Sequence, residues 1–362
     1  MTLPRTTAAF FLIFCLFLLF TGCGETAVPQ TTAVSQAAPT EIPATETAVP
    51  ATNIPLPEPT EPGPTATIEP TATLPPSPTA TPTIWHEVAK MPTSRSEMSA
   101  GVIDCRIYVP GGWSNGYGQS VALEIYDPAT DAWTKLADLP FHVNHHATAV
   151  YNNALYVFGP DDTALRYDPA ADTWQELAPM PENRWAGAAA ALGDYLYFVG
   201  GSGSSSDLLR YDPNADSWTR LAPLLQAREH TQAVALDGQL YALGGRWDRG
   251  LNSVERYDPA TDTWTRIPSM NQPRSGFGAA VWGGKIVVAG GELISPLAII
   301  DSIEIFDPAQ NRWEMANVTM PVPLHGLPVA IIEDELYLLG GSGLAGDVSN
   351  RGRVYRYRLN SP

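Results

Sequence analysis

The chain has 362 residues, in which 21 lysines and arginines face 38 aspartates and glutamates, giving a formal net charge of −17. Such an acidic chain lacks the basic surface that phosphate backbones require, so we expect no nucleic-acid partner. Its three cysteines, at positions 15, 23 and 105, are too few and too scattered for a disulfide framework. Stability must therefore come from a packed core.

The first 22 residues have the pattern of a secretory signal. An apolar run of 13 residues, Ala8 to Phe20, follows the single basic residue Arg5 and is too short to span a bilayer as a helix. The run ends in Phe20-Thr21-Gly22-Cys23, which resembles a bacterial lipobox, although phenylalanine stands where leucine is usual. We expect residues 1–22 to be a lipoprotein signal peptide and Cys23 to be lipidated; an ordinary signal peptide is the alternative.

Residues 23–83 are rich in proline and threonine. The stretch 24–83 contains 14 prolines and 15 threonines and no Trp, Tyr or Phe. Without aromatic residues it cannot bury enough apolar surface to offset the entropy of ordering. We expect a disordered linker that holds the rest of the chain away from the membrane, with the lipid anchor as the only membrane contact.

The remaining residues, 84–362, are built from one repeated unit. Five copies of an aromatic-Asp-Pro motif begin at positions 126, 167, 211, 257 and 306, and each has a tryptophan seven residues after its aromatic residue. Ahead of most copies lies a hydrophobic stretch that ends in a glycine pair, and the second unit has Gly159-Pro160 instead. A period of 41–49 residues between tryptophans is typical of propeller blades or solenoid repeats.

Each unit predicts four short strands and almost no helix. In the fourth unit two alternating runs meet at Asp237-Gly238, a strong hairpin signal. The first strands, such as GAAAAL at 187–192, consist of small residues, as expected where innermost strands approach one another closely.

The glycine pairs, tyrosines and tryptophans at this period resemble the kelch repeat, over essentially all of residues 84–362. The resemblance implies an all-β fold, a kelch β-propeller. The strand around Trp85 precedes any complete unit, and the last unit stops after Tyr357 without a tryptophan. We expect these two partial units to share one sheet, which gives six blades with the last closed by the N-terminal strand.

Candidate ligand-binding residues lie where the units differ. Four arginines stand sixteen residues before the first glycine of a pair: Arg95, Arg184, Arg228 and Arg274. Alignment along the strand places Asn144 at this position in the second unit, and Leu324 followed by His325 in the last. Because fold symmetry puts these residues on one face, we expect a local basic ring that binds carboxylates. The alternative is that each arginine pairs with a carboxylate of the neighbouring blade. In animal kelch propellers, arginines in these loops bind acidic peptides, and the resemblance therefore favours binding.

Further polar residues flank this ring. Trp185 offers an aromatic surface and Arg246 a further cation, while Glu97, Glu229, His146 and His230 are weak candidates for acid–base chemistry. His142, His145 and His146 form an HxxHH cluster, but no carboxylate or cysteine at ligand spacing accompanies it. We therefore expect no metal and no other cofactor.

These residues favour a binding module that recognises a protein segment or an anionic glycan at the cell surface. The alternative is a carbohydrate enzyme, because exported six-bladed kelch proteins include N-acetylneuraminate mutarotases, which the chain resembles in blade count and export. A copper radical oxidase of the galactose oxidase type is disfavoured, since it needs a crosslinked cysteine and the repeat region contains only Cys105.

The lipid anchor is directly testable. Replacing Cys23 by Ala removes the acylated thiol, so we expect the protein to move from the membrane fraction to the soluble fraction, as measured by immunoblotting after ultracentrifugation. Cys105→Ala is the matched control and should stay membrane-bound. Membrane association that persists in Cys23→Ala would rule out the lipoprotein assignment.

Overall fold

The computed structural model describes residues 85–114, 118–202, 206–344 and 352–359. Every regular element in these residues is a strand, with 29 strands and no helix. No helix in this part of the chain is therefore long and apolar enough to cross a membrane. The expected signal peptide 1–22, Cys23 and the linker to residue 83 lie outside the described residues.

Most strands belong to six four-stranded antiparallel sheets. Sheet 1 contains β3 (Gly101–Ile103), β4 (Arg106–Pro110), β7 (Leu123–Asp127) and β8 (Ala132–Lys135). Sheet 2 contains β9 (Ala147–Tyr151), β10 (Ala154–Phe158), β11 (Ala164–Asp168) and β12 (Thr173–Glu176). Sheet 3 contains β13 (Ala188–Leu192), β14 (Tyr195–Val199), β15 (Leu208–Asp212) and β16 (Ser217–Leu221).

The other three sheets follow the same plan. Sheet 4 contains β17 (Gln232–Leu236), β18 (Gln239–Leu243), β19 (Val254–Asp258) and β20 (Thr263–Ile267). Sheet 5 contains β21 (Gly278–Trp282), β22 (Lys285–Ala289), β25 (Ser302–Asp307) and β26 (Arg312–Thr319). Sheet 6 contains β27 (Val329–Ile332), β28 (Glu335–Leu339), β29 (Val354–Arg358) and β1 (His86–Val88).

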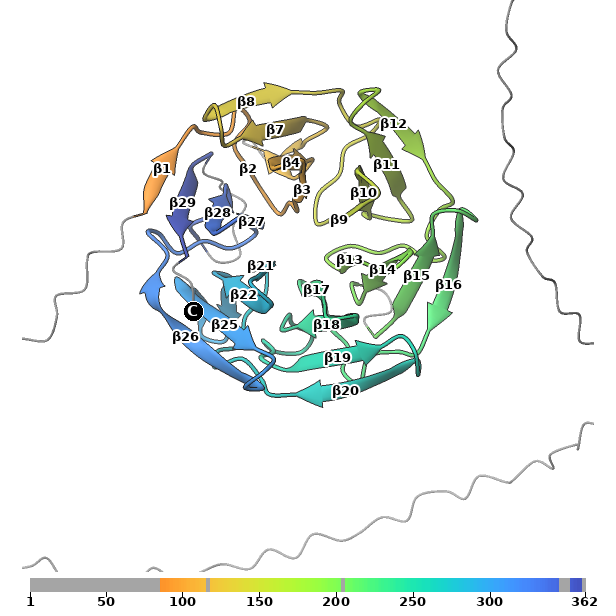
Figure 1. Ribbon diagram of the computed structural model, residues 1–362, viewed down its shortest axis with the longest axis vertical. Helices are drawn as coiled ribbons and strands as arrows, with labels where there is room; N and C mark the ends of the chain where they lie inside the picture. The colour runs from red at the N-terminus through yellow and green to blue at the C-terminus, as the bar shows by residue number, and fades with distance from the viewer. Residues whose placement is uncertain (1–84, 115–117, 203–205, 345–351, 360–362) are drawn as a thin grey trace, which may run out of the picture. The chain divides into compact units, whose positions relative to one another are not determined.

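The six sheets are arranged around a common centre, with the first strand of each innermost (Figure 1). The expected hairpin at Asp237-Gly238 is confirmed, since these residues join β17 to β18 with φ of 51° and 75°. Small residues on the inner strands are also explained. A Cβ added to Gly278 would lie 2.8 Å from the backbone nitrogen of Val329 on the next inner strand, so only glycine fits there.

The two ends of the repeat region meet in sheet 6. Strand β1 runs antiparallel to β29, with His86 opposite Arg356 and Val88 opposite Val354. The Trp85 ring packs against Tyr357, with 4.9 Å between ring centroids. The expectation that the strand around Trp85 completes the last unit is confirmed.

In sheets 1 to 4 the repeated Tyr, Asp and Trp residues hold the sheet to the one before it. In sheet 3 the Tyr211 hydroxyl donates to Asp216 at 2.6 Å, and the same Asp216 oxygen accepts the Ala178 N–H at 2.8 Å. The Trp218 indole donates to the Ala178 carbonyl at 2.8 Å. Both backbone groups of one residue at the end of the preceding sheet are thus bound. We call this arrangement the seam clamp.

Sheets 1, 2 and 4 repeat the seam clamp with Asp131, Asp172 and Asp262 as the acceptors. Sheet 5 departs from it at three places together. Phe306 has no hydroxyl, Asn311 replaces the aspartate, and the residue to be held is Pro268, which has no N–H to offer. Only the indole contact remains there, from Trp313 to the Pro268 carbonyl at 3.0 Å. The three changes are consistent with one another, because an aspartate acceptor is not needed where both the tyrosine hydroxyl and the backbone N–H are missing.

Apolar clusters fill the spaces between neighbouring sheets. Between sheets 3 and 4, for example, Tyr197 and Leu208 pack with Leu240 and Tyr257, all of them buried. The core is therefore distributed around the ring in the seams between sheets.

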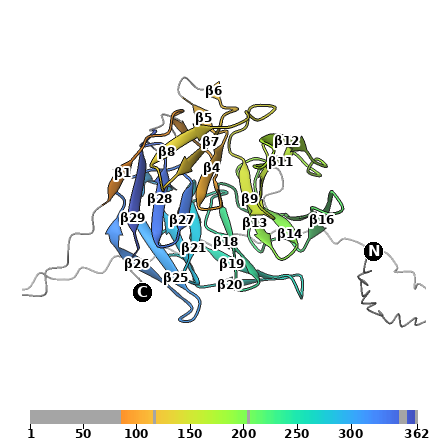
Figure 2. The same ribbon diagram turned by 45° about the horizontal axis from the view of Figure 1, so that its top comes forward.

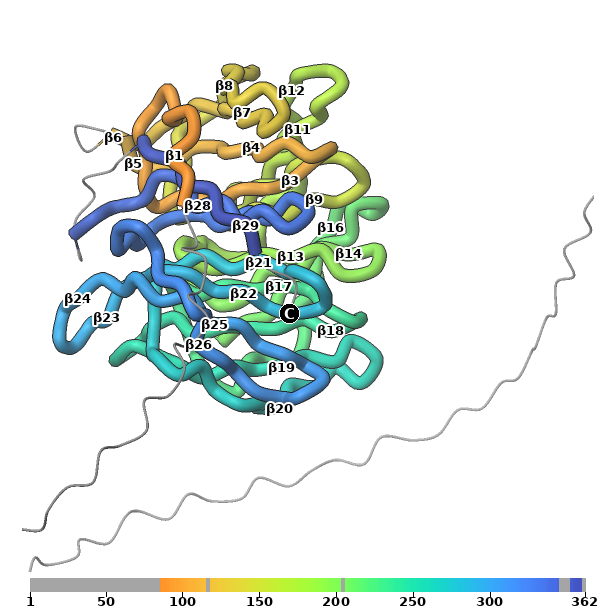
Figure 3. Tube along the Cα trace, turned by 60° about the vertical axis from the view of Figure 1, so that its left-hand side comes forward, coloured from red at the N-terminus to blue at the C-terminus, as the bar shows by residue number. Residues whose placement is uncertain are grey.

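The long connections all leave the sheets at one face. They are the loops from the fourth strand of one sheet to the first of the next, and those from second to third strands; we call this side the loop face. It includes the hairpin of β23 (Glu292–Ile294) with β24 (Leu297–Ile299), and the small sheet of β2 (Arg95–Ser96), β5 (Trp113–Ser114) and β6 (Gly118–Gln119). Figure 3 shows β5, β6, β23 and β24 projecting beyond the six sheets, and Figure 2 shows β5 and β6 from another side.

The seam clamp predicts a specific cost of mutation. Asp216→Ala leaves the Tyr211 hydroxyl and the Ala178 N–H without their acceptor, so we expect unfolding to become easier by about 1–2 kcal/mol. Urea denaturation of the full chain, followed by tryptophan fluorescence, measures this. Asp194→Ala, in the exposed β13–β14 turn, is the control and should change little. Equal effects of the two substitutions would contradict the clamp.

Candidate functional site

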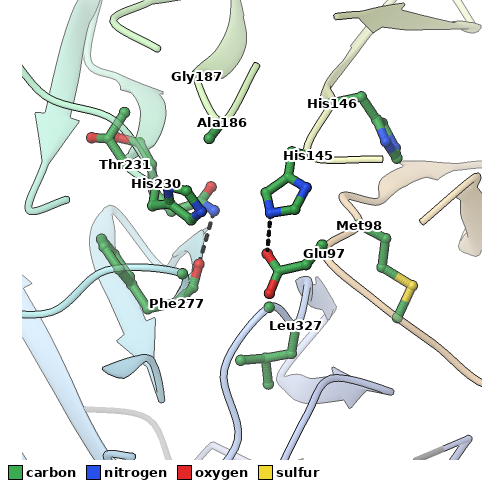
Figure 4. A pocket seen from close by; sticks show the side chains of 13 residues that line it. Glu97, Met98, His145, His146, Ala186, Gly187, His230, Thr231, Phe277 and Leu327 are labelled. Atoms are coloured by element: carbon green, nitrogen blue, oxygen red, sulfur yellow. Dashed lines mark hydrogen bonds and ion pairs between the residues drawn. The ribbon is translucent and has the colours of Figure 1, made fainter. Parts of the chain in front are cut away.

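A small, open pocket lies at the centre of the loop face. Figure 4 shows Glu97 and His145 facing each other across it, with His230 on the neighbouring wall. These side chains come from the loops that enter sheets 1, 2 and 4, so residues far apart in the sequence meet at the ring centre.

Six equivalent residues, one ahead of each sheet, form the wall of this pocket. They are Glu97, His145, Ala186, His230, Gly276 and Gly326, and we call them the mouth ring. All six have positive φ, from 47° to 59°. Five backbone hydrogen bonds of 2.6–3.0 Å link them in order, each N–H donating to the carbonyl of the preceding member. The backbone therefore fixes where every mouth-ring side chain begins.

The glycine pairs position the mouth ring. The second glycine of each pair donates its N–H to the loop that enters the next sheet. Gly245, for example, donates to the carbonyl of Arg274 at 2.8 Å, two residues before the mouth-ring residue Gly276. A Cβ on Gly245 would lie 2.6 Å from the Glu229 carbonyl oxygen, so this close approach requires glycine. The repeat motif thus supports a site whose side chains it does not itself supply.

Glu97 is the electrostatic centre of the pocket. Its carboxylate oxygens lie 3.4 Å from His145 Nε2 and 3.4 Å from His325 Nε2. Burial alone would raise the pKa of Glu97, but the facing histidines 145, 230 and 325 and Arg246 outweigh it and lower the pKa below its ordinary value. Glu97 is therefore a carboxylate at neutral pH.

Arg246 stands at the edge of the pocket in a network of its own. Its guanidinium contacts Glu229 at 3.3 Å and Glu292 at 2.7 Å, and its Nη2 lies 3.1 Å from His230 Nε2. Three carboxylates (Glu97, Glu229 and Glu292) therefore share the mouth with one arginine. These four side chains together carry a net negative charge.

The four arginines expected to form a basic ring are fully buried, and this corrects the expectation. Arg95, Arg184, Arg228 and Arg274 have no exposed surface. Each is paired with a carboxylate of its own sheet rather than of its neighbour: Glu124, Asp207, Glu255 and Glu304 in turn. Arg228 also donates to the carbonyls of Gly244 and Ser253, and Arg274 to those of Gly290 and Ser302. They brace the loop entering each sheet and cannot reach a ligand.

Asn144 does not occupy the position of these arginines. The Gly112 N–H donates to the Val143 carbonyl, as Gly201 does to that of Arg228, so Val143 is the equivalent residue. Asn144 corresponds instead to Trp185 and to His325. Its amide oxygen lies 2.5 Å from His145 Nδ1. The strand-based alignment was wrong by one residue: the turn between β9 and β10 has two residues, as the turn between β13 and β14 has, so counting sixteen residues back from Gly159 gives Val143.

The remaining predicted residues are divided between the pocket and its rim. Trp185 is 42% exposed and its ring lies edge-on to His145 and His230, at 5.5 Å and 5.6 Å. His146 is buried in the pocket wall, and His325 is buried against the Glu97 carboxylate. Glu292 and the pairing role of His145 were missed by the sequence. Counting two residues on from each arginine reaches four of the six mouth-ring residues, Glu97, Ala186, His230 and Gly276, and so would have placed Glu97 and His230 together.

Comparison with known families supports the repeat assignment. A Kelch motif model matches residues 94–140, 227–271 and 273–317, and a second Kelch motif model matches residues 184–225. An F-box/kelch-repeat protein of Arabidopsis thaliana is 42% identical over 60 residues, or 16% of this chain and 13% of its own length. Kelch-like protein 25 of Homo sapiens is 37% identical over 71 residues, or 20% of this chain and 12% of its own. The chain thus spans only about an eighth of these relatives.

Buried His146 predicts acid sensitivity. Burial, with the nearby Arg95, lowers the pKa of His146 to about 3, whereas the unfolded side chain titrates near its usual value of about 6.5. Between pH 6.5 and pH 3 the His146 side chain is protonated in the unfolded state but not in the folded state. The free energy of unfolding therefore falls as the pH drops through this range, by at most about 1.4 kcal/mol per pH unit. His146→Phe should flatten this slope in urea titrations between pH 6.5 and 4.5. His142→Phe, an exposed neighbour, should leave the slope unchanged; an unchanged slope in His146→Phe would contradict the assignment.

Proposed function

Because the chain carries kelch repeats, we propose that it is a binding module that recognises a segment of a protein partner on the loop face. A kelch repeat is typically a protein-interaction module. We further interpret the six sheets as the six blades of a β-propeller closed by β1. Such a scaffold holds its loops on a rigid base, which suits recognition.

The observation that carries the proposal is the distribution of exposed apolar side chains. Eight large hydrophobic residues of the described chain are exposed, and six of them lie in loop-face connections. These six are Phe141, Trp185, Leu225, Trp247, Leu297 and Leu344. Exposed aromatic anchors beside polar groups are the usual centres of protein interfaces.

The charge of the mouth determines which partner we favour. The arginines that would bind an anionic glycan or an acidic peptide are buried, and Arg246 is already paired with two carboxylates. We therefore favour a protein segment that is neutral or basic where it meets the mouth. For the same reason we do not extend the sugar-enzyme alternative, since its clamp would have required Arg184 or Arg228 to be accessible.

We also propose that the module works outside the cytoplasm, tethered to the bacterial cell envelope through Cys23 and the linker that follows it. This part of the proposal rests on the sequence of residues 1–83, and the Cys23→Ala fractionation tests it independently of the binding function.

The binding surface can be tested by a matched pair of variants of the full chain. Surface proteins of the source cells are crosslinked to the wild type and identified, and the affinity of the purified partner is then measured. The Trp185→Ala/Trp247→Ala double variant should bind at least about tenfold more weakly, because two aromatic anchors are lost. Met315→Ala is the control, since it is 45% exposed on the outer strand β26. Unchanged affinity in the double variant, or equal weakening in the control, would overturn the proposed surface.

A further inference from the structure

We propose that Glu97, His145 and His230 bind one divalent transition-metal ion of borderline softness, such as Zn²⁺, at the centre of the mouth ring. One ligand atom from each of these side chains lies within 4.8 Å of the others. Two imidazoles and one carboxylate are a common zinc ligand set. The inference departs from the sequence expectation of no metal, and it does not depend on the proposed protein-binding function.

The backbone geometry of the mouth ring is the first support. All six positions require positive φ, which costs a residue with a side chain about 1 kcal/mol or more and costs glycine nothing. Sheets 5 and 6 accordingly have Gly276 and Gly326 there. The other four positions hold residues with side chains in the same strained conformation, and three of the four, Glu97, His145 and His230, offer metal ligands.

The hydrogen bonding of His145 is the second support. The Asn144 amide oxygen can only accept, so His145 Nδ1, 2.5 Å away, carries the proton and donates it. This leaves a lone pair on His145 Nε2, which faces Glu97 Oε2 at 3.4 Å. Adjacent ligand atoms of a tetrahedral site with bonds of about 2.1 Å are about 3.4 Å apart. Asn144 thus acts as the outer partner that orients a metal-binding imidazole.

His230 is held ready by a cation that a metal ion can displace. A guanidinium only donates, so Arg246 Nη2 places its hydrogen on the His230 Nε2 lone pair at 3.1 Å. When a metal ion takes that lone pair, Arg246 keeps its contacts with Glu229 and Glu292. Arg246 is therefore a built-in competitor, and its removal should strengthen metal binding.

The remaining mouth-ring positions leave the site open. Ala186, Gly276 and Gly326 place no more than a methyl group into the pocket, so that water or an incoming ligand has room to complete the coordination. A Cβ on Gly326 would lie 2.5 Å from Glu97 Oε1, so glycine is required for the carboxylate to reach this position. His325, on the other oxygen of Glu97, keeps the carboxylate in place.

Metal titration of the full chain tests the site. The protein, without a histidine tag, is treated with chelator, dialysed and titrated with Zn²⁺ by calorimetry and with Co²⁺ by visible absorption. We expect one equivalent of Zn²⁺ bound with micromolar or tighter affinity, and visible Co²⁺ bands of a four- or five-coordinate site. Binding weaker than about 100 μM, or without defined stoichiometry, overturns the proposal.

Variants locate the ion. Glu97→Gln and His145→Ala should each weaken binding by tenfold or more, whereas His142→Ala, from the same loop but outside the mouth ring, should not. Arg246→Gln should tighten binding severalfold, a gain that a misfolded protein cannot produce. Loss of binding in His142→Ala, or no change in Glu97→Gln and His145→Ala, would place the ion elsewhere and overturn the assignment.

Discussion

The structure depends on the seam clamp, in which a tyrosine, an aspartate and a tryptophan hold both backbone groups of one residue in the preceding sheet. A four-stranded sheet of this size cannot bury its faces alone, and in sheets 1 to 4 the clamp holds the sheet to its neighbour where the apolar seams close. Every residue of the clamp belongs to the repeated motif. Because the clamp is local and repeated, its spacing in the sequence reveals the number and order of the sheets, and these expectations were the most successful.

The buried arginines show where sequence reasoning failed, and the correcting signal was present. Glu124, Glu255 and Glu304 each stand three residues before the aspartate of the aromatic-Asp-Pro motif, in the same units as Arg95, Arg228 and Arg274. The units without an arginine at this place have Leu165 and Tyr355 at the glutamate position, and the third unit, with Arg184, has Leu209 there and takes its carboxylate from Asp207, two residues earlier. An arginine and a glutamate that are present or absent together in a unit indicate a salt bridge within that unit. An arginine paired in this way is not available to bind a ligand.

The site itself could be predicted only in part. The sequence located the face and named Glu97, His146, His230 and His145, because loops between repeats are where units differ. The sequence could not show which of these side chains meet in the pocket. Their meeting depends on six structurally equivalent mouth-ring positions, and these positions hold residues as different as glutamate and glycine. Chemical type does not reveal that equivalence. The shared positive φ and the chain of backbone hydrogen bonds do.

Sheet 6 imposes an order on assembly. Its outer strand β1 comes from the start of the repeat region and its partner β29 from the end, so the pairing of Val88 with Val354 spans nearly all of the repeat region. Bringing such distant segments together lowers the conformational entropy of the chain before the contacts between β1 and β29 can offset that loss. Sheets 1 to 5 are each formed from continuous chain, whereas sheet 6 needs both ends of the repeat region. If that pairing were lost, β29 and the apolar side of sheet 1 would be left as exposed edges, the kind of surface through which chains associate.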